Sequence, residues 1–136
     1  MMNFSLYSQE TIENLSKLQN EEFFATLQES IDTLVDTVNS GGNILVCGNG
    51  GSYSDALHFA GELVNFFTRE HRALPVIALG TNGAVSTAWS NDHAFEDQFA
   101  REVEAYGRPN SVLIGITTSG KSKNVNNAFS VAKAIG

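Results

Sequence analysis

Residues 43–52, Asn-Ile-Leu-Val-Cys-Gly-Asn-Gly-Gly-Ser (NILVCGNGGS), decide the fold class of this chain. The run Asn43–Cys47 is short and apolar, as is typical of a buried parallel strand. A glycine-rich loop at 48–52 follows at once, and a helical stretch is predicted from there to about Phe67. A strand that passes through such a loop into a helix is the usual beginning of an α/β unit.

The same order of strand, loop and helix recurs along the rest of the chain. Val76–Leu79 and Ser111–Ile116 are further apolar runs suited to buried strands. Helices are predicted at 82–90, 95–106 and 122–135. Strands that alternate with helices form a parallel sheet with both faces covered. We therefore predict an α/β fold with a flavodoxin-like parallel sheet flanked by helices.

The first forty residues are predicted to be helical. A short helix is expected around 8–18, and a longer one runs from Phe24 to the pair Gly41-Gly42. We expect residues 1–40 to form a helical segment that packs on the domain or on a neighbouring subunit, and 41–136 to form the domain itself. Because the chain stops just after a predicted helix, where another strand should follow, we expect this domain to be incomplete at its C-terminus. The apolar stripe of the longer helix consists of Leu27, Ile31, Leu34, Val35 and Val38.

The composition excludes several classes of protein. With 136 residues, of which 42% are hydrophobic and 17% charged, the chain suits one globular domain with a real core. Its net charge of −7 argues against nucleic-acid binding, which usually needs a basic face. No apolar run approaches the roughly 18 residues of a membrane span, and the N-terminus lacks the basic start of a signal peptide. Cys47 is the single cysteine, which fits a reducing compartment, so we expect a cytoplasmic protein.

Two loops rich in glycine and hydroxyl groups follow predicted strands and open helices. The first, CGNGGS at 47–52, lets the backbone approach an anion closely. The second, TTSGKS at 117–122, places hydroxyl groups around one glycine. Ligands of open parallel sheets bind at the carboxyl ends of strands, and helix N-termini favour phosphate. Each loop alone could be an ordinary strand-to-helix turn, but together they favour a phosphate site.

The second loop also matches a nucleotide-binding pattern. Residues 115–122, GITTSGKS, satisfy the P-loop form G-x-x-x-x-G-K-[ST]. Three observations oppose a nucleoside triphosphatase: the loop follows the third strand, too few residues remain for a further acidic strand, and Ile116 extends the strand past Gly115. The first loop begins like a dinucleotide motif, but Tyr53 occupies the place of its third glycine. We therefore expect no nucleotide cofactor.

The helix after the first loop carries a polar face. Asp55, His58 and Glu62 lie three and four residues apart, so they share one side of the helix. His58 and Glu62 can bind one metal ion or share proton-transfer work, and a solvated side-chain pair is the alternative. The opposite stripe, expected to pack on the sheet, consists of Ala56, Phe59, Ala60, Leu63 and Phe67.

Together these segments resemble a known family. The chain is similar to the phosphoheptose isomerases, which have the sugar isomerase (SIS) fold, over 41–136. The resemblance implies an SIS-type fold, a homotetramer, and interconversion of sedoheptulose 7-phosphate and D-glycero-D-manno-heptose 7-phosphate, an early step toward the heptose of lipopolysaccharide or capsule. The motifs that carry it are CGNGGS at 47–52, DA..HFA.EL at 55–63, LPVIAL at 74–79, ND..F at 91–95 and GITTSGKS at 115–122.

The resemblance also implies roles for individual residues. Glu62 would be the general base that moves a proton between C1 and C2 through an enediol. In members that bind zinc, His58 and Glu62 would be ligands. The phosphate would be held by Thr117, Thr118, Ser119 and Ser122, and the sugar phosphate would also contact Asn49, Gly50, Gly51, Ser52, Asn91 and Asp92.

The sequence also departs from the family pattern. Gly61 stands where an acidic residue is expected and Phe66 where an arginine is usual, which removes one anion contact. A glutamine and a histidine that complete the catalytic and metal set fall outside these 136 residues, so we expect this stretch alone to lack activity. The alternative function is that of a non-catalytic SIS regulator, such as the adaptor that binds the bacterial replication initiator. Glu62 favours the enzyme, because that adaptor has no carboxylate at the matching position.

Overall fold

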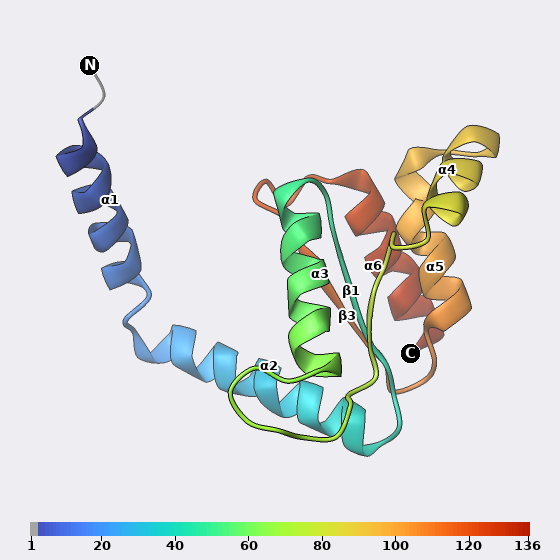
Figure 1. Ribbon diagram of the computed structural model, residues 1–136, viewed down its shortest axis with the longest axis horizontal. Coiled ribbons are helices and arrows are strands. Elements are labelled where there is room, and N and C mark those ends of the chain that lie inside the picture. The colour runs from blue at the N-terminus through green and yellow to red at the C-terminus, as the bar shows by residue number, and fades with distance from the viewer. Residues whose placement is uncertain (1–2) are drawn as a thin grey trace. The chain divides into compact units, whose positions relative to one another are not determined.

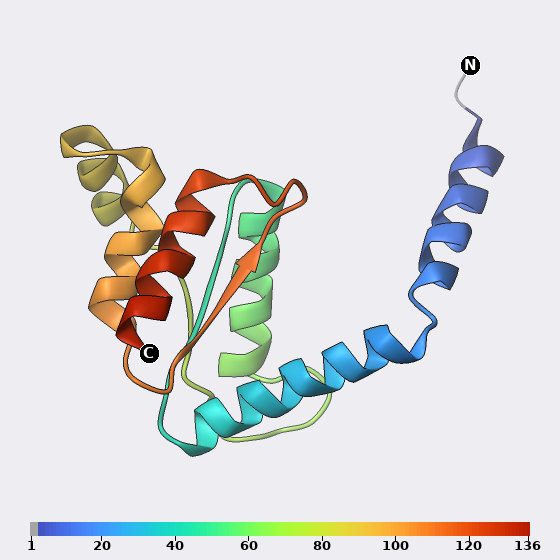
Figure 2. The same cartoon turned by 180° about the vertical axis from the view of Figure 1, so that it is seen from behind.

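A computed structural model describes residues 3–136 of the chain (Figures 1 and 2). The chain divides into two compact units, the first ending at Thr33 and the second covering Leu34–Gly136. The second unit begins inside a helix because Leu34 and Val38 pack against the core of the sheet. No helix among residues 3–136 is long and apolar enough to cross a membrane.

The first unit contains α1 (Phe4–Lys17) and the first part of α2 (Glu21–Asn39). Asparagine side chains begin both helices: Asn3 accepts a hydrogen bond from the N–H of Leu6, and Asn20 accepts one from the N–H of Phe23. Such caps satisfy amides that have no partner within the helix. Of the stripe predicted on the longer helix, Leu27, Ile31 and Val35 are exposed.

The second unit contains a parallel sheet, as the sequence predicts. Its strands are β1 (Ile44–Gly48), β2 (Val76–Ala78) and β3 (Val112–Ile116), in the order β2-β1-β3. Every residue of the central strand β1 is buried, because it has a neighbour on each side and helices on each face. Gly48 pairs with Ile116, so β1 and β3 reach the same edge of the sheet.

Helices cover both faces of this sheet. Figures 1 and 2 show α3 on one side of the strands and α5 with α6 on the other. Residues of β1 alternate between two cores: Ile44 and Val46 pack with Ala56 of α3, whereas Leu45 and Cys47 pack with side chains of α5 and α6. The helices after β1 are α3 (Gly51–Val64), α4 (Gly83–Asp92), the short 3-10 turn η1 (Phe95–Asp97), α5 (Gln98–Tyr106) and α6 (Lys123–Ile135).

One expectation about the helices is wrong. The helix α3 ends at Val64 instead of Phe67, and Phe67 is 77% exposed instead of packing on the sheet. The reason is that Asn65 leaves helical geometry, so Phe67 no longer follows the helical period. The stretch 95–106 is helical as predicted, with a single 3-10 turn, η1, leading into α5.

Candidate functional site

The two predicted loops lie side by side at the carboxyl ends of β1 and β3. Because Gly48 and Ile116 are paired, the residues that follow them, Asn49 and Thr117, begin neighbouring loops. Gly50 precedes α3 with φ +57°, and Gly120 lies in the second loop with φ +65°. Both angles fall in the region that favours glycine, so the two turns depend on these residues. The helices α3 and α6 therefore both start at this edge.

Hydroxyl groups organise the second loop. The Thr117 hydroxyl accepts a hydrogen bond from the N–H of Gly120 at 3.2 Å and lies 3.3 Å from the Ser122 hydroxyl. The Ser119 hydroxyl accepts a hydrogen bond from the N–H of Lys121 at 3.1 Å. Two of the four predicted phosphate ligands, Thr117 and Ser122, thus contact each other, Ser119 is bonded separately to the backbone of Lys121, and Thr118 lies in the same loop. The loop leads into the N-terminus of α6, where first-turn amides have no acceptor within the helix.

A pair of asparagines joins the two loops. The side-chain amide of Asn49 donates to Oδ1 of Asn124 at 2.9 Å, and that of Asn124 donates back to Oδ1 of Asn49 at 2.8 Å. Asn124 is in the first turn of α6 and is 2% exposed. Asn49 is thus held in place by a residue that the sequence analysis did not single out. The sequence signal that could have indicated Asn124 is its place directly before the apolar residue Val125, which is buried.

A cavity of about 330 Å³ opens next to the first loop. Of the predicted site residues, Asn49 and Gly50 line it, whereas Gly51 and Ser52 are in the first turn of α3 and do not. Glu62 and the four predicted phosphate ligands of the second loop are also outside its lining. Its lining residues include no lysine or arginine, so an anion here would depend on amides, hydroxyls and side-chain amides. The lining residues are Gly48, Asn49, Gly50, Tyr53, Gly80, Ser86, Phe95, Gln98 and Phe99.

A third strand-end loop forms the far wall of this cavity. It begins at Gly80, whose N–H donates to the carboxylate of Glu102 and whose carbonyl accepts from the Tyr53 hydroxyl at 2.9 Å. Burial raises the pKa of Glu102 above its ordinary value, and the hydrogen bond from Gly80 opposes that rise. The sequence analysis missed Glu102. It could have been found, because Glu102 follows Phe99 by three residues and therefore occupies the apolar face of α5.

The predicted base and metal ligand form a pair on α3. The distance between Nε2 of His58 and Oε1 of Glu62 is 3.0 Å, and their side chains are 77% and 35% exposed. Asp55 does not join them: residues 3–136 contain no group of three or more His, Cys, Asp or Glu side chains able to hold a metal ion. A structural zinc site uses four ligands, and a catalytic one uses three plus water. These residues alone therefore do not form a zinc site.

The remaining predicted contacts lie at the end of α4. The side chains of Asn91 and Asp92 are exposed, hydrogen-bonded to each other at 2.8 Å, and outside the lining of the cavity. Close by, the ring of Trp89 stacks on His93 with centroids 4.0 Å apart, and the guanidinium of Arg101 lies 4.8 Å from the Trp89 centroid. These contacts between α4 and α5 fix the end of the helix that carries Asn91 and Asp92.

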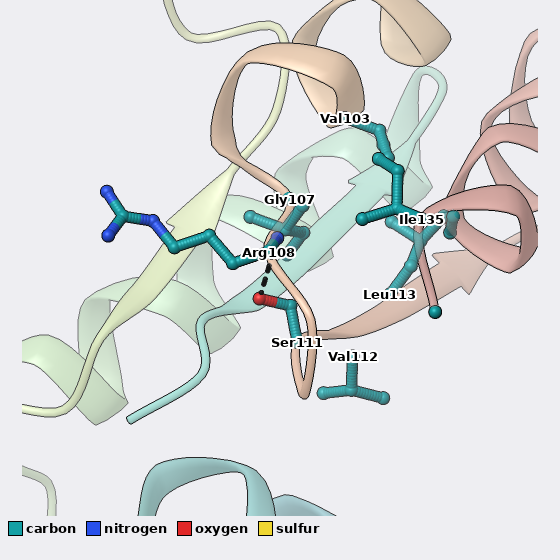
Figure 3. A pocket seen from close by; sticks show the side chains of 10 residues that line it. Val103, Gly107, Arg108, Ser111, Val112, Leu113 and Ile135 are labelled. Carbon is teal, nitrogen blue, oxygen red and sulfur yellow. Dashed lines mark hydrogen bonds between the residues drawn. The ribbon is translucent and has the colours of Figure 1, made fainter. Parts of the chain in front are cut away.

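A second hollow lies at the opposite edge of the sheet, where β3 begins (Figure 3). Its volume is only about 20 Å³, and most of its lining is apolar, with Val103, Leu113 and Ile135 pointing toward it. The Ser111 hydroxyl accepts a hydrogen bond from the N–H of Arg108 at 3.2 Å, while the Arg108 side chain extends away (Figure 3). A space of this size holds about one water molecule, so it is not a sugar-phosphate site.

Comparisons with known proteins agree with this geometry. A phosphoheptose isomerase from Crocosphaera subtropica is 47% identical over 122 residues, which cover 90% of this chain and 62% of that protein. One from Helicobacter pylori is 49% identical over 110 residues, covering 81% of this chain and 57% of the relative. The chain thus spans about three-fifths of the length of the curated relatives it matches.

Solved structures give the same result. A phosphoheptose isomerase from Francisella tularensis superimposes with a TM-score of 0.91 at 34% identity, covering 97% of this chain and 69% of that one. The phosphoheptose isomerase GmhA from Neisseria gonorrhoeae gives a TM-score of 0.86, also at 34% identity, covering 97% of this chain and 68% of that one. The predicted resemblance and fold class are therefore confirmed. Since the profile of the SIS domain also matches residues 6–136, this chain belongs to the SIS domain family.

Proposed function

We propose that this chain is the greater part of a phosphoheptose isomerase, which converts sedoheptulose 7-phosphate to D-glycero-D-manno-heptose 7-phosphate through an enediol. The observation that supports the proposal is the pairing of Gly48 with Ile116, because the two loops rich in glycine and hydroxyl groups then begin next to each other, and the first of them lines a cavity of about 330 Å³. Relatives that share this fold at 34% identity and above are phosphoheptose isomerases.

The phosphate is assigned to the second loop. Thr117, Thr118, Ser119 and Ser122 would supply hydroxyl groups, and the backbone N–H groups of Lys123 and Asn124 at the start of α6 would supply further donors, since that of Val125 is bonded to the side chain of Asn124. The partial positive charge of a helix N-terminus favours an anion, so no lysine or arginine is required. The rest of the sugar phosphate would lie along the first loop, at Asn49, Gly50, Gly51 and Ser52, with Asn91 and Asp92 as ligands of sugar hydroxyls.

Glu62 is assigned the proton transfer. As a carboxylate it would accept the proton from one of the two carbons and return it to the other, so the charge of the enzyme is the same before and after the reaction. The ring of His58, 3.0 Å away, would orient this carboxylate. We assign no residue within 3–136 to the proton that moves between the two oxygen atoms.

Three further properties belong to the same proposal. Zinc, if bound, would take His58 and Glu62 as two of its ligands, and we derive no step through it because these residues do not complete a site. We also propose a cytoplasmic homotetramer, in which apolar side chains of the N-terminal helices contact other subunits. Within the first unit, Phe4 is 74% and Ile12 is 64% exposed.

The test is turnover of sedoheptulose 7-phosphate by the full-length protein. Glu62→Gln keeps the size of the side chain and removes its basicity, so kcat should fall by about 100-fold or more. Glu70→Gln is the matched control, since Glu70 is an exposed glutamate outside the site, and its kcat should remain within about twofold. Binding without turnover by the wild type would favour the regulator or adaptor function. If the wild type neither binds nor turns over sedoheptulose 7-phosphate, the proposal is refuted.

A further inference from the structure

We propose that Glu102 is a positioning residue for the candidate site: through the backbone of Gly80 it fixes the loop after β2 as one wall of the cavity. The effect on Gly80 follows from the geometry alone. The effect on substrate rests on the function proposed above. Glu102 itself does not line the cavity, so it would act only through Gly80.

Side chains from opposite faces of the sheet hold the two backbone groups of Gly80. Glu102 belongs to α5, whose neighbours Phe99 and Val103 are in the core on one face. Tyr53 belongs to α3, whose Ala56 and Ala60 are in the core on the other face. The carboxylate accepts from the N–H of Gly80, and the phenol donates to its carbonyl at 2.9 Å. The start of this loop is therefore bonded from both sides.

The backbone conformation of Gly80 and the space around it also restrict this position. Its φ of +84° lies in the region that favours glycine. A Cβ at this position would lie 3.2 Å from a ring carbon of Phe99 and 3.3 Å from one of Tyr53, tighter than ordinary contact. The rings of Phe99 and Tyr53, which line the cavity, thus leave little room for a side chain at Gly80, which also lines it. A change in the position of Gly80 would alter the shape of this wall.

The surroundings of Glu102 show that its carboxylate does not serve an ion pair. It is 4% exposed, and within residues 3–136 no lysine or arginine pairs with it. Its neighbour Arg101 instead pairs with Glu104 at 2.9 Å and lies over Trp89. A carboxylate buried without a cation costs stability compared with an apolar residue of similar size. What it contributes locally is the acceptor for one part-buried backbone N–H, that of Gly80.

The fixed loop also places a second part of the cavity. Two residues after Gly80, Asn82 caps α4 by accepting a hydrogen bond from the N–H of Ala84 at 3.1 Å. The next turn of this helix carries Ser86, which lines the cavity. Because Gly80 lies just before this helix start, loosening it would affect both the wall and the position of the Ser86 hydroxyl.

The experiment compares two substitutions in the full-length protein. Glu102→Leu removes the acceptor, whereas Glu102→Gln keeps an acceptor oxygen and removes the charge. Hydrogen exchange of the Gly80 amide, followed by NMR, reports the hydrogen bond directly, and KM for sedoheptulose 7-phosphate reports its effect on the site. With Leu we expect exchange about tenfold faster and KM about tenfold higher, the effect of losing one part-buried hydrogen bond. With Gln both should remain within about threefold, and kcat should change little in either variant.

Each outcome decides the proposal. If the exchange rate of the Gly80 amide is unchanged in Glu102→Leu, the proposal is overturned. It is also overturned if exchange and KM rise equally in the Leu and Gln variants, because any change at position 102 would then explain the data. Faster exchange with an unchanged KM would show that the fixed loop does not matter to substrate. If the wild type does not turn over sedoheptulose 7-phosphate, the proposed function fails, while Gly80 exchange still decides the positioning role. Glu102→Met, which is flexible and apolar, replaces the Leu variant if that protein does not fold.

Discussion

The paired amides of Asn49 and Asn124 allow a quantitative test of how the two loops are joined. Asn124→Ala removes both mutual hydrogen bonds, of 2.8 and 2.9 Å, and a third one from the N–H of Val125 at 3.0 Å. Each contributes about 1 kcal/mol net, so we expect this substitution to lower the free energy of unfolding by about 3 kcal/mol. Asn49→Ala removes only the mutual pair and should cost about 2 kcal/mol.

The double substitution separates the interaction from the side effects. Once one of the two amides is removed, removing the other breaks no further mutual hydrogen bond. The double-mutant cycle, measured by urea unfolding, should therefore give a coupling energy of about 1–2 kcal/mol. Asn126→Ala is the control: Asn126 is exposed on the same helix, and its bond to the carbonyl of Gly120 is long at 3.4 Å. It should combine additively with Asn49→Ala. A coupling energy within about 0.5 kcal/mol of zero for Asn49 and Asn124 would refute the reasoning.

Three further predictions concern Gly115, Glu102 and Cys47. A Cβ at Gly115 would lie 2.7 Å from side-chain atoms of α6, so Gly115→Ala should destabilise the fold by about 1–3 kcal/mol in thermal unfolding, whereas Gly61→Ala, with nothing within 4 Å, should be neutral or slightly stabilising. Because the pKa of Glu102 is raised in the folded state, the wild type should lose stability relative to Glu102→Gln as pH rises from about 4 to 7; an unchanged difference in Tm would contradict this. Burial raises the pKa of Cys47 to about 12, so a thiol reagent at about pH 8 should label it only as fast as the protein unfolds, and rapid labelling of the native state would disprove this.

The central strand and its loop were predictable because their signal is local. An apolar run such as Asn43–Cys47 can only be buried, and the glycines that follow must turn the chain. The adjacency of the two loops follows from the parallel sheet that these elements imply. The end of α3 was not predictable, because Phe67 continues the apolar period although the chain has already left the helix at Asn65. Periodicity alone does not locate the last turn of a helix.

The residues that hold the site together were missed for a different reason. Asn49 and Asn124 are 75 residues apart in the chain, and Gly80 and Glu102 are 22 apart. A polar side chain on a helix is usually solvated. The apolar neighbours of Glu102 and Asn124 indicate that these two are buried, but nothing local shows which distant loop each one binds. Only the packing of α5 and α6 on the sheet turns Glu102 and Asn124 inward.

The central place of β1 has a consequence for how the protein folds during synthesis. The N–H of Asn43, just before this strand, is bonded to the hydroxyl of Ser111, 68 residues later. Until the chain beyond Ser111 is synthesised, the backbone N–H and C=O groups on one edge of β1 have no partner strand, and such an edge can pair with another chain. During that interval the nascent chain is most exposed to aggregation, and the time at which β3 emerges sets when the risk ends.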